Sequence, residues 1–165
     1  MLRCKHGVSG VRRAGTGFFR LAKALVQVFL GIQTLFLDLF PISSHPNSFR
    51  VVGTTIYFGG LAMTLAARQG LGRNWVDLED YRIVPGQSLV TRGPYRYLRH
   101  PVYTGDLLLF IGLELALNSW LVLAAVPLVV VMIRQALAEE ALLSKTFPQY
   151  RAYCERTKRF IPFVV

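Results

Sequence analysis

Two short polar clusters interrupt an otherwise apolar chain, and they hold the side chains best suited to chemistry. Arg99, His100 and Pro101 stand at the start of a long apolar stretch, and Glu139 and Glu140 close it. Proline is favoured at the first position of a helix, where the free amides carry about half a positive charge, so the first cluster predicts a site for a carboxylate. The glutamates can accept hydrogen bonds from hydroxyl or ammonium groups. Together the clusters could bind a ligand that carries both signs of charge.

The elements that must position these clusters are membrane helices. Hydrophobic residues make up 53% of the 165 residues, and the mean hydropathy of +0.40 is high for a soluble domain. Apolar runs cover residues 18–40, 49–67 and 102–133. Because a hydrocarbon core of about 30 Å takes roughly 20 helical residues to cross, the first two runs each predict one span.

The third run is too long for one span, since a single helix would reach about 48 Å. The polar dipeptide Asn118-Ser119 lies near its middle and predicts a break between helices over 102–117 and 120–138. We therefore expect an all-α, polytopic membrane protein with about four transmembrane helices, a helical hairpin in the C-terminal half, a cytosolic loop and a C-terminal helix. We expect one domain over 1–165, divided into a basic N-terminal flank (1–17), two spans (18–70) and a motif-bearing half (71–165).

The distribution of Lys and Arg supports four spans. Six precede residue 24, one lies in the first connection, six lie between Arg68 and Arg99, none lies near Asn118, and six lie from Arg134 onward. Four spans place the three rich segments on one side of the bilayer, as the positive-inside rule requires, with both termini cytosolic. The net charge of +10 then indicates topology and attraction to anionic lipid headgroups, and we find no nucleic-acid-binding motif.

The N-terminal flank and the cysteines allow fewer conclusions. Residues 1–37 hold six basic residues and no acid, so a transit peptide is an alternative to a simple cytosolic flank. Cys4 and Cys154 both fall on the predicted cytosolic side, where thiols usually stay reduced, and they predict neither a disulfide framework nor a metal site.

The residues around both clusters resemble a known family. Residues 89–105 read LVTRGPYRYLRHPVYTG, and residues 139–150 read EEALLSKTFPQY. Both segments resemble the signature of the isoprenylcysteine carboxyl methyltransferase and phospholipid methyltransferase family of membrane enzymes. The resemblance extends over residues 71–163, and two motifs in the right order make it more specific than either motif alone.

The resemblance implies S-adenosylmethionine as cofactor and a lipophilic acceptor, with no metal and no nucleic acid. Arg99, Glu139 and Arg134 are the implied catalytic residues. The implied cofactor pocket contains Gln87, Ser88, Leu89, Val90, Tyr95, Arg99, His100, Pro101, Val102, Tyr103, Glu139 and Glu140. One departure puts the substrate in doubt, because the family has an arginine four residues before the first glutamate, where this chain has Gln135 and places Arg134 one residue earlier.

The expected reaction is methyl transfer to a prenylcysteine-like carboxylate or another small amphiphile. A carboxylate is ionised at neutral pH and needs no general base, whereas a phospholipid amine must first lose a proton. Three alternatives stay open: a phospholipid amine N-methyltransferase, an NADPH-dependent membrane reductase of similar helical layout, and a non-catalytic membrane scaffold. The acceptor, the cellular membrane and the oligomeric state are not predicted.

Several residues also have a purely structural interpretation. Tyr95, Tyr97, Tyr103 and Trp75 fit an interfacial aromatic belt. Gly53, Gly59 and Gly60 are typical of close helix packing. Asp106 could offset the charge of Arg99 or favour the helix N-terminus, and Glu114 is expected to be structural or a rim residue rather than catalytic.

Overall fold

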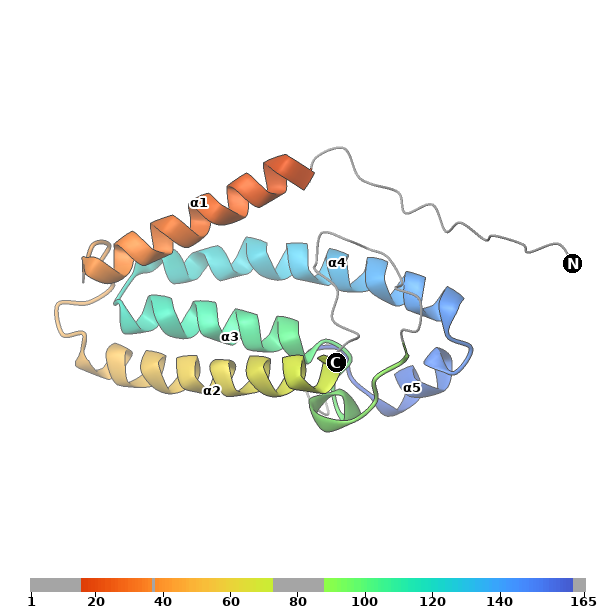
Figure 1. Cartoon of the computed structure of the whole chain (residues 1–165). Helices are drawn as coiled ribbons and strands as arrows, with labels where there is room; N and C mark the ends of the chain where they lie inside the picture. The colour runs from red at the N-terminus through yellow and green to blue at the C-terminus, as the bar shows by residue number, and fades with distance from the viewer. Residues whose placement is uncertain (1–15, 37, 73–87, 162–165) are drawn as a thin grey trace, which may run out of the picture.

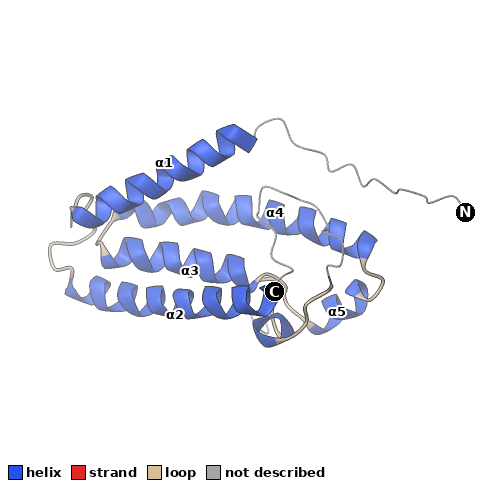
Figure 2. Cartoon of the chain, in the orientation of Figure 1, coloured by secondary structure: helices blue, strands red, loops and turns tan. Residues whose placement is uncertain are grey.

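The chain is all-helical throughout the residues that the computed structural model describes, which are 16–36, 38–72 and 88–161, with side chains described from residue 24. Figures 1 and 2 show the helices and their order. The elements are α1 (Thr16–Leu35), α2 (Asn47–Leu71), the 3-10 helix η2 (Gly93–Arg96), α3 (Pro101–Ala116), the 3-10 helix η3 (Trp120–Ala124), α4 (Ala125–Thr146) and α5 (Tyr150–Arg156).

The long helices alternate in direction, so their ends gather at two opposite ends of the bundle (Figure 1). One end collects the last turns of α2 and α4, the start of α3, and the short helices η2 and α5. The other end holds the connection from α1 to α2 and the connection from α3 to α4. The break that we predicted at Asn118-Ser119 is confirmed, and it brings both polar clusters of the sequence to the first end.

Helices α2 and α3 pack with almost no side chain between them. A Cβ atom at Gly60 would lie 2.7 Å from the backbone nitrogen of Leu109, and one at Gly112 would clash with the backbone nitrogen of Tyr57. Gly53 and Gly105 complete this glycine seam, which repeats every seven residues on each helix. The packing role predicted for Gly53 and Gly60 is confirmed, but the prediction for Gly59 was wrong, because a Cβ there would meet nothing within 4 Å.

A polar corner closes the end of the bundle opposite the two clusters. Asn118 adopts a left-handed conformation with φ of 54°, which asparagine tolerates better than most residues. Its side-chain amide donates to Asp38 Oδ1 at 2.9 Å and to the Ser43 carbonyl at 2.8 Å, while its Oδ1 accepts from the Ser43 amide. Asp38 also pairs with Arg50 at 2.7 Å. The corner thus fastens the connection between α1 and α2 to the connection between α3 and α4.

A buried hydrogen bond joins α1 to α3. The Gln33 amide donates to Glu114 Oε2 at 2.8 Å, and both side chains are fully buried. The structural role expected for Glu114 agrees with this position. Asp106 accepts from Thr64 Oγ1 on α2 at 3.1 Å, and Arg99 pairs with Glu140.

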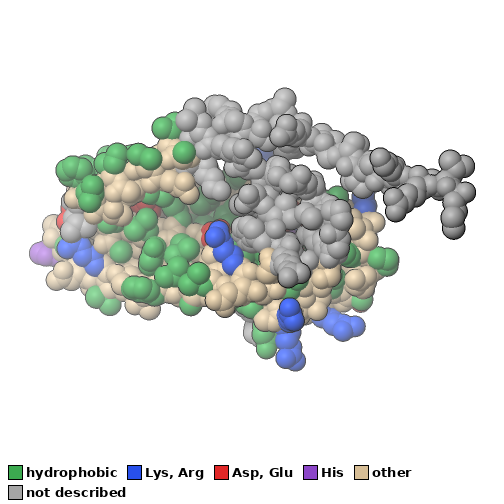
Figure 3. Space-filling view, viewed as in Figure 1, with side chains coloured by type: hydrophobic (Ala, Val, Ile, Leu, Met, Phe, Trp, Pro, Cys, Tyr) green, Lys and Arg blue, Asp and Glu red, His purple; other side chains and the backbone are tan. Residues whose placement is uncertain are grey.

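Among the described residues, two helical segments are long and apolar enough to cross a bilayer, namely α2 (Asn47–Leu71) and the continuous segment of η3 and α4 (Trp120–Thr146). Many of their large apolar side chains are exposed, among them Val51, Phe58, Val126 and Val131, and Figure 3 shows such side chains spread along the visible face of the bundle. Helix α3 has 16 residues and would span about 24 Å at 1.5 Å per residue. Exposed apolar surface of this kind is expected where lipid replaces water.

Candidate active site

The first polar cluster forms the N-terminus of α3. Pro101 is the first residue of the helix and His100 precedes it as the N-cap residue. Pro101, Val102 and Tyr103 are all buried. Proline fits this position because its missing amide hydrogen would have no partner in the first turn. The helix therefore begins where the sequence predicted, and its positive end faces the cluster.

The segment after α5 completes the cluster by pairing with the residues before α3. The Arg99 amide donates to the Lys158 carbonyl at 2.7 Å, and the His100 amide donates to the Arg159 carbonyl at 3.1 Å. The Thr104 hydroxyl donates to the Phe160 carbonyl at 2.9 Å. We refer to residues 157–161 as the C-terminal strap. The sequence did not predict this contact, because backbone carbonyls carry it.

Glu140 lies at the centre of the charged side chains at this end of the bundle. Its Oε1 accepts from Arg99 Nε at 2.9 Å and from Arg159 Nε at 3.0 Å, and it lies 3.2 Å from His100 Nε2. Its Oε2 accepts from Arg159 at 2.9 Å. Arg99 also donates to the carbonyls of Cys154 and Thr157, at 3.0 and 2.6 Å. These contacts bind α3, α4, α5 and the C-terminal strap into one cluster.

Glu139 has fewer partners and is more exposed. It accepts a short hydrogen bond from the Tyr103 hydroxyl, and its other oxygen lies 3.5 Å from His100 Nδ1. Its side chain is 27% exposed, against 13% for Glu140. A carboxylate has about four lone-pair sites, so Glu139 keeps acceptor capacity, whereas Glu140 already serves Arg99, His100 and Arg159.

His100 lies between the two glutamates and between two aromatic rings. Its ring centroid is 5.5 Å from that of Tyr103 and 5.7 Å from that of Phe160. Burial lowers the pKa of the His100 imidazole, but hydrogen bonds to Glu139 and Glu140 and their negative charges outweigh burial, and the net effect is a raised pKa. Both ring nitrogens face a carboxylate, and this arrangement favours the protonated form of the ring.

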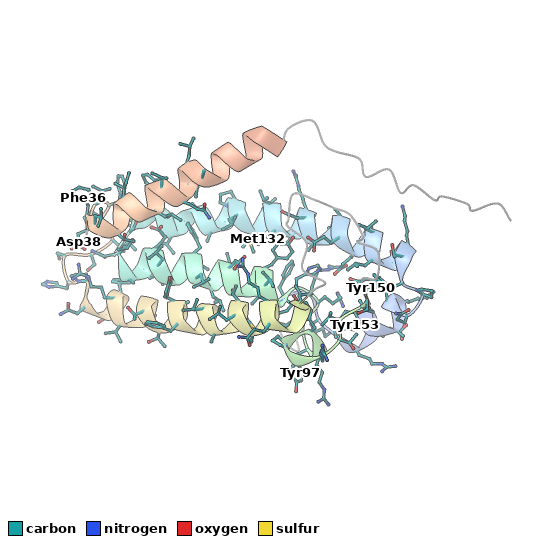
Figure 4. All side chains as sticks on the ribbon, in the orientation of Figure 1. Phe36, Asp38, Tyr97, Met132, Tyr150 and Tyr153 are labelled. Carbon is teal, nitrogen blue, oxygen red and sulfur yellow. The ribbon has the colours of Figure 1, made fainter. Side chains whose placement is uncertain are left out.

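The register of α4 decides which of its side chains face the site. Met132 and Ala136 are buried against Tyr103, and the label in Figure 4 places Met132 on this helix. Glu139 and Glu140 follow one turn later on the same face. Arg134 is exposed and Gln135 is half-buried. Gln135, which occupies the position of the family's arginine, therefore lies nearer the buried face of α4 than Arg134 does. Helix α4 continues to Thr146, beyond the end at residue 138 that the sequence predicted, so both glutamates lie within the helix.

The remaining predicted cofactor residues precede η2. Gln87 lies outside the described residues. Ser88 is exposed, and Leu89 and Val90 are half-buried. Tyr95 is buried with Ala67 and Val102, and Val90 packs against them. The structure thus brings His100, Tyr103, Glu139 and Glu140 into direct contact, and it keeps Arg134 apart from them.

Acidic, histidine and cysteine side chains do not gather in threes anywhere in the described part of the chain in a way that could hold a metal ion. The charges of the cluster are instead balanced by one another.

Comparisons with known proteins agree with this geometry. Residues 49–150 match the family described as phospholipid methyltransferase. The matched segment contains most of α2, all of α3, the glutamate pair and the first residue of α5. The chain therefore belongs to the phospholipid methyltransferase family. Its fold is similar to the solved structure of the eukaryotic intramembrane Ras methyltransferase, an isoprenylcysteine carboxyl methyltransferase. The TM-score is 0.62 with 25% identity, over 90% of this chain and 53% of that chain.

Two curated bacterial proteins are also similar over 109 residues. The cobalt-zinc-cadmium resistance protein CzcN of Cupriavidus metallidurans is 34% identical, and the nickel-cobalt-cadmium resistance protein NccN of Alcaligenes xylosoxydans is 33% identical. The match covers 63% of this chain and 47% or 48% of those proteins. The chain thus spans about half the length of the curated relatives it matches.

Proposed function

We propose that this membrane methyltransferase transfers a methyl group from S-adenosylmethionine to a prenylcysteine-like carboxylate or another small amphiphile. The observation that carries the proposal is the contact of His100 and Tyr103 on α3 with Glu139 on α4. These residues come from the two motifs that resemble the family's cofactor pocket, and they meet at one end of a bundle with two membrane-length helices. Membership of a methyltransferase family favours this function over the reductase and scaffold alternatives.

The chemistry of the cluster fits the cofactor. S-Adenosylmethionine carries an ammonium group, a carboxylate, ribose hydroxyls and a sulfonium, so its site needs donors and acceptors together. Glu139 keeps acceptor sites for an ammonium or hydroxyl group. The positive end of α3 suits the carboxylate. We assign Glu140 and Arg99 to positioning, because their polar atoms already bind each other and the C-terminal strap.

The residues of the site would act mainly by positioning and by excluding water. The sulfonium, when bound, supplies an activated methyl group that needs no acid or base to leave. Tyr103 and His100 hold the Glu139 carboxylate from two sides, which fixes its direction before a ligand arrives. The rings of Tyr103 and Phe160 cover His100 and keep water from it.

The acceptor is proposed from the partners of His100. An ionised carboxylate needs no base, whereas an amine must first lose a proton, and both ring nitrogens of His100 already face Glu139 and Glu140. One observation favours the second candidate, a phospholipid amine, because Glu139 is a partly exposed carboxylate that could hold a cationic headgroup. Arg134, which would hold a carboxylate, is exposed on α4.

A methyl-transfer assay separates the candidates. Purified protein in lipid nanodiscs would be given radiolabelled S-adenosylmethionine with a small prenylated thiol acid, with phosphatidylethanolamine, or with total lipid. We expect label in a base-labile ester of the prenylated acid. Label in an alkali-stable lipid amine would show that a phospholipid amine is the acceptor. Absence of label with every acceptor would refute the proposed activity.

Loss of the Glu139 carboxylate should weaken cofactor binding. Glu139→Ala is expected to lower the affinity for S-adenosylmethionine about 10- to 150-fold, because one charge-assisted hydrogen bond contributes roughly 1.5–3 kcal/mol. Isothermal titration in detergent measures this affinity. The matched control is Glu155→Ala on α5, which removes an exposed carboxylate and should leave affinity unchanged. Equal affinity of Glu139→Ala and wild type would contradict the site assignment.

We also propose that the protein is a multi-pass membrane protein with four spans and with both termini in the cytosol. Reporter fusions after residue 45 and at Asn118 should then report the non-cytosolic side, whereas fusions at Gln87 and after Val165 should report the cytosol. The physical reason is the positive-inside rule, since the segments near Asn118 carry no Lys or Arg. Finding Gln87 and Val165 on opposite sides would exclude this topology.

A further inference from the structure

Tyr150 is the first residue of α5, and its hydroxyl is buried without an oxygen or nitrogen partner. The residue is 3% exposed, and its hydroxyl oxygen is among the few buried side-chain atoms of the described residues whose hydrogen bonding is unsatisfied. A buried polar group without a partner costs free energy. Such a group is expected where a ligand supplies the missing partner.

The surroundings of Tyr150 belong to the cluster built around Glu140. Figure 4 shows the residue at the junction of α4 and α5. Burial raises its pKa, the negative charge of Glu140 raises it further, and the positive charge of Arg99 opposes this. Arg99 donates to the carbonyl of Cys154, one turn after Tyr150 on α5. The hydroxyl therefore lies beside the positioned charges, although it takes part in none of their hydrogen bonds.

The neighbouring tyrosine shows that this end of the chain can satisfy a buried phenol. The Tyr153 hydroxyl donates to the carbonyl of Tyr95 at 2.8 Å and to that of Leu98 at 3.3 Å. The rings of Tyr150 and Tyr153 lie 5.9 Å apart. The Cys154 thiol lies beside the Tyr150 hydroxyl and raises its pKa through its charge and a side-chain hydrogen bond, but a thiol is a weak hydrogen-bond partner that leaves the hydroxyl without a strong acceptor. Tyr150 and Tyr153 thus differ in whether the protein supplies a carbonyl oxygen that accepts the hydrogen bond of the hydroxyl.

We infer that the Tyr150 hydroxyl donates a hydrogen bond to bound S-adenosylmethionine, which makes Tyr150 a further cofactor-binding residue. The inference rests on the proposed function, because that function supplies the ligand. Its side chain keeps its proton at neutral pH, since the pKa is raised, so its O–H group can donate to an oxygen or a ring nitrogen of the ligand. Glu139 offers the complementary acceptor from α4.

Removing only this hydroxyl gives a clean test. Tyr150→Phe in the full-length protein is expected to bind S-adenosylhomocysteine about 3- to 10-fold more weakly than wild type, as for loss of one neutral hydrogen bond. Without ligand, its melting temperature should be unchanged or higher, since the unsatisfied group is gone. Titration calorimetry and thermal unfolding in detergent measure the two quantities.

Tyr153→Phe is the matched control, because it removes a hydroxyl that the protein does satisfy. It should lower the melting temperature and leave the affinity near that of wild type. Equal affinities of Tyr150→Phe and wild type would overturn the inference, as would a melting temperature of Tyr150→Phe lowered as far as that of Tyr153→Phe. If wild type itself binds no S-adenosylhomocysteine, the proposed function fails, and the inference fails with it.

Methylthioadenosine, which lacks the amino-acid part of the cofactor, then locates the contact. If Tyr150→Phe weakens the binding of both ligands equally, the hydroxyl faces the nucleoside. If it weakens only S-adenosylhomocysteine, the hydroxyl faces the amino-acid part. Either result supports Tyr150 as a cofactor-binding residue.

Discussion

Glu140→Ala should destabilise the protein more than any other single substitution in the site. It leaves Arg99, His100 and Arg159 without the carboxylate that they share, and removing one partner of a buried charge pair typically costs about 3–5 kcal/mol. For a chain of this length such a loss lowers the melting temperature by roughly 6–20 °C. Methyl transfer should be lost with it, because the C-terminal strap and His100 are both positioned through Glu140. Thermal unfolding in detergent checks the stability.

Two further variants test whether the charge or the size of the Glu140 side chain stabilises this end of the bundle. Glu140→Gln keeps a hydrogen-bond acceptor of the same size, so its melting temperature should lie between those of Glu140→Ala and wild type. Arg159→Ala removes one of the three cations and should cost less than Glu140→Ala, because Arg99 and His100 keep their partner. A melting temperature of Glu140→Ala within about 2 °C of wild type, less than 1 kcal/mol, would show that the cluster does not hold this end together.

The second large effect is expected in the glycine seam. Gly112→Leu places side-chain atoms where the backbone of Tyr57 lies, so α2 and α3 must separate along their whole contact. Overpacking of a close interface costs about 1–3 kcal/mol and sometimes more, which lowers the melting temperature by roughly 2–12 °C for a chain of this length. Size-exclusion chromatography after extraction should show more aggregated protein, because separated helices expose their backbone.

Gly59→Leu is the matched control for this substitution. It makes the same change on α2, one residue before Gly60, where an added Cβ meets nothing within 4 Å. Its melting temperature should stay close to that of wild type. If both leucine variants behave alike, helix propensity or hydrophobicity would explain the effect, and the seam would not.

Hydropathy and charge predicted the course of the helices because the bilayer imposes length and sidedness on a sequence. A run such as 102–133 cannot remain one span, and Asn118 supplies the left-handed residue that ends α3. The meeting of His100 with Glu139 followed from the same reasoning, since two successive antiparallel helices return the chain to the same end of the bundle. These features depend on composition over many residues, so a single sequence is enough to predict them.

Contacts made by the backbone could not be predicted in the same way. The C-terminal strap binds α3 through the carbonyls of Lys158, Arg159 and Phe160, and every residue type has a carbonyl. Likewise the partner of Arg99 depended on the rotation of α4, which decides that Glu140 rather than Asp106 reaches it. The hydroxyl of Tyr150 could be recognised only after the partners of its neighbours were known.

The C-terminal strap also affects the order in which parts of the fold can form during synthesis. Helices α2 and α3, which form the glycine seam, leave the ribosome well before Arg159, and folding during synthesis generally starts from the N-terminal side. The hairpin of α2 and α3 can therefore form while Arg99 and His100 still lack Glu140, and Glu140 in turn waits for Arg159. During biosynthesis the helix pair assembles first, and the charged end of the bundle closes only when the last residues of the strap have been made.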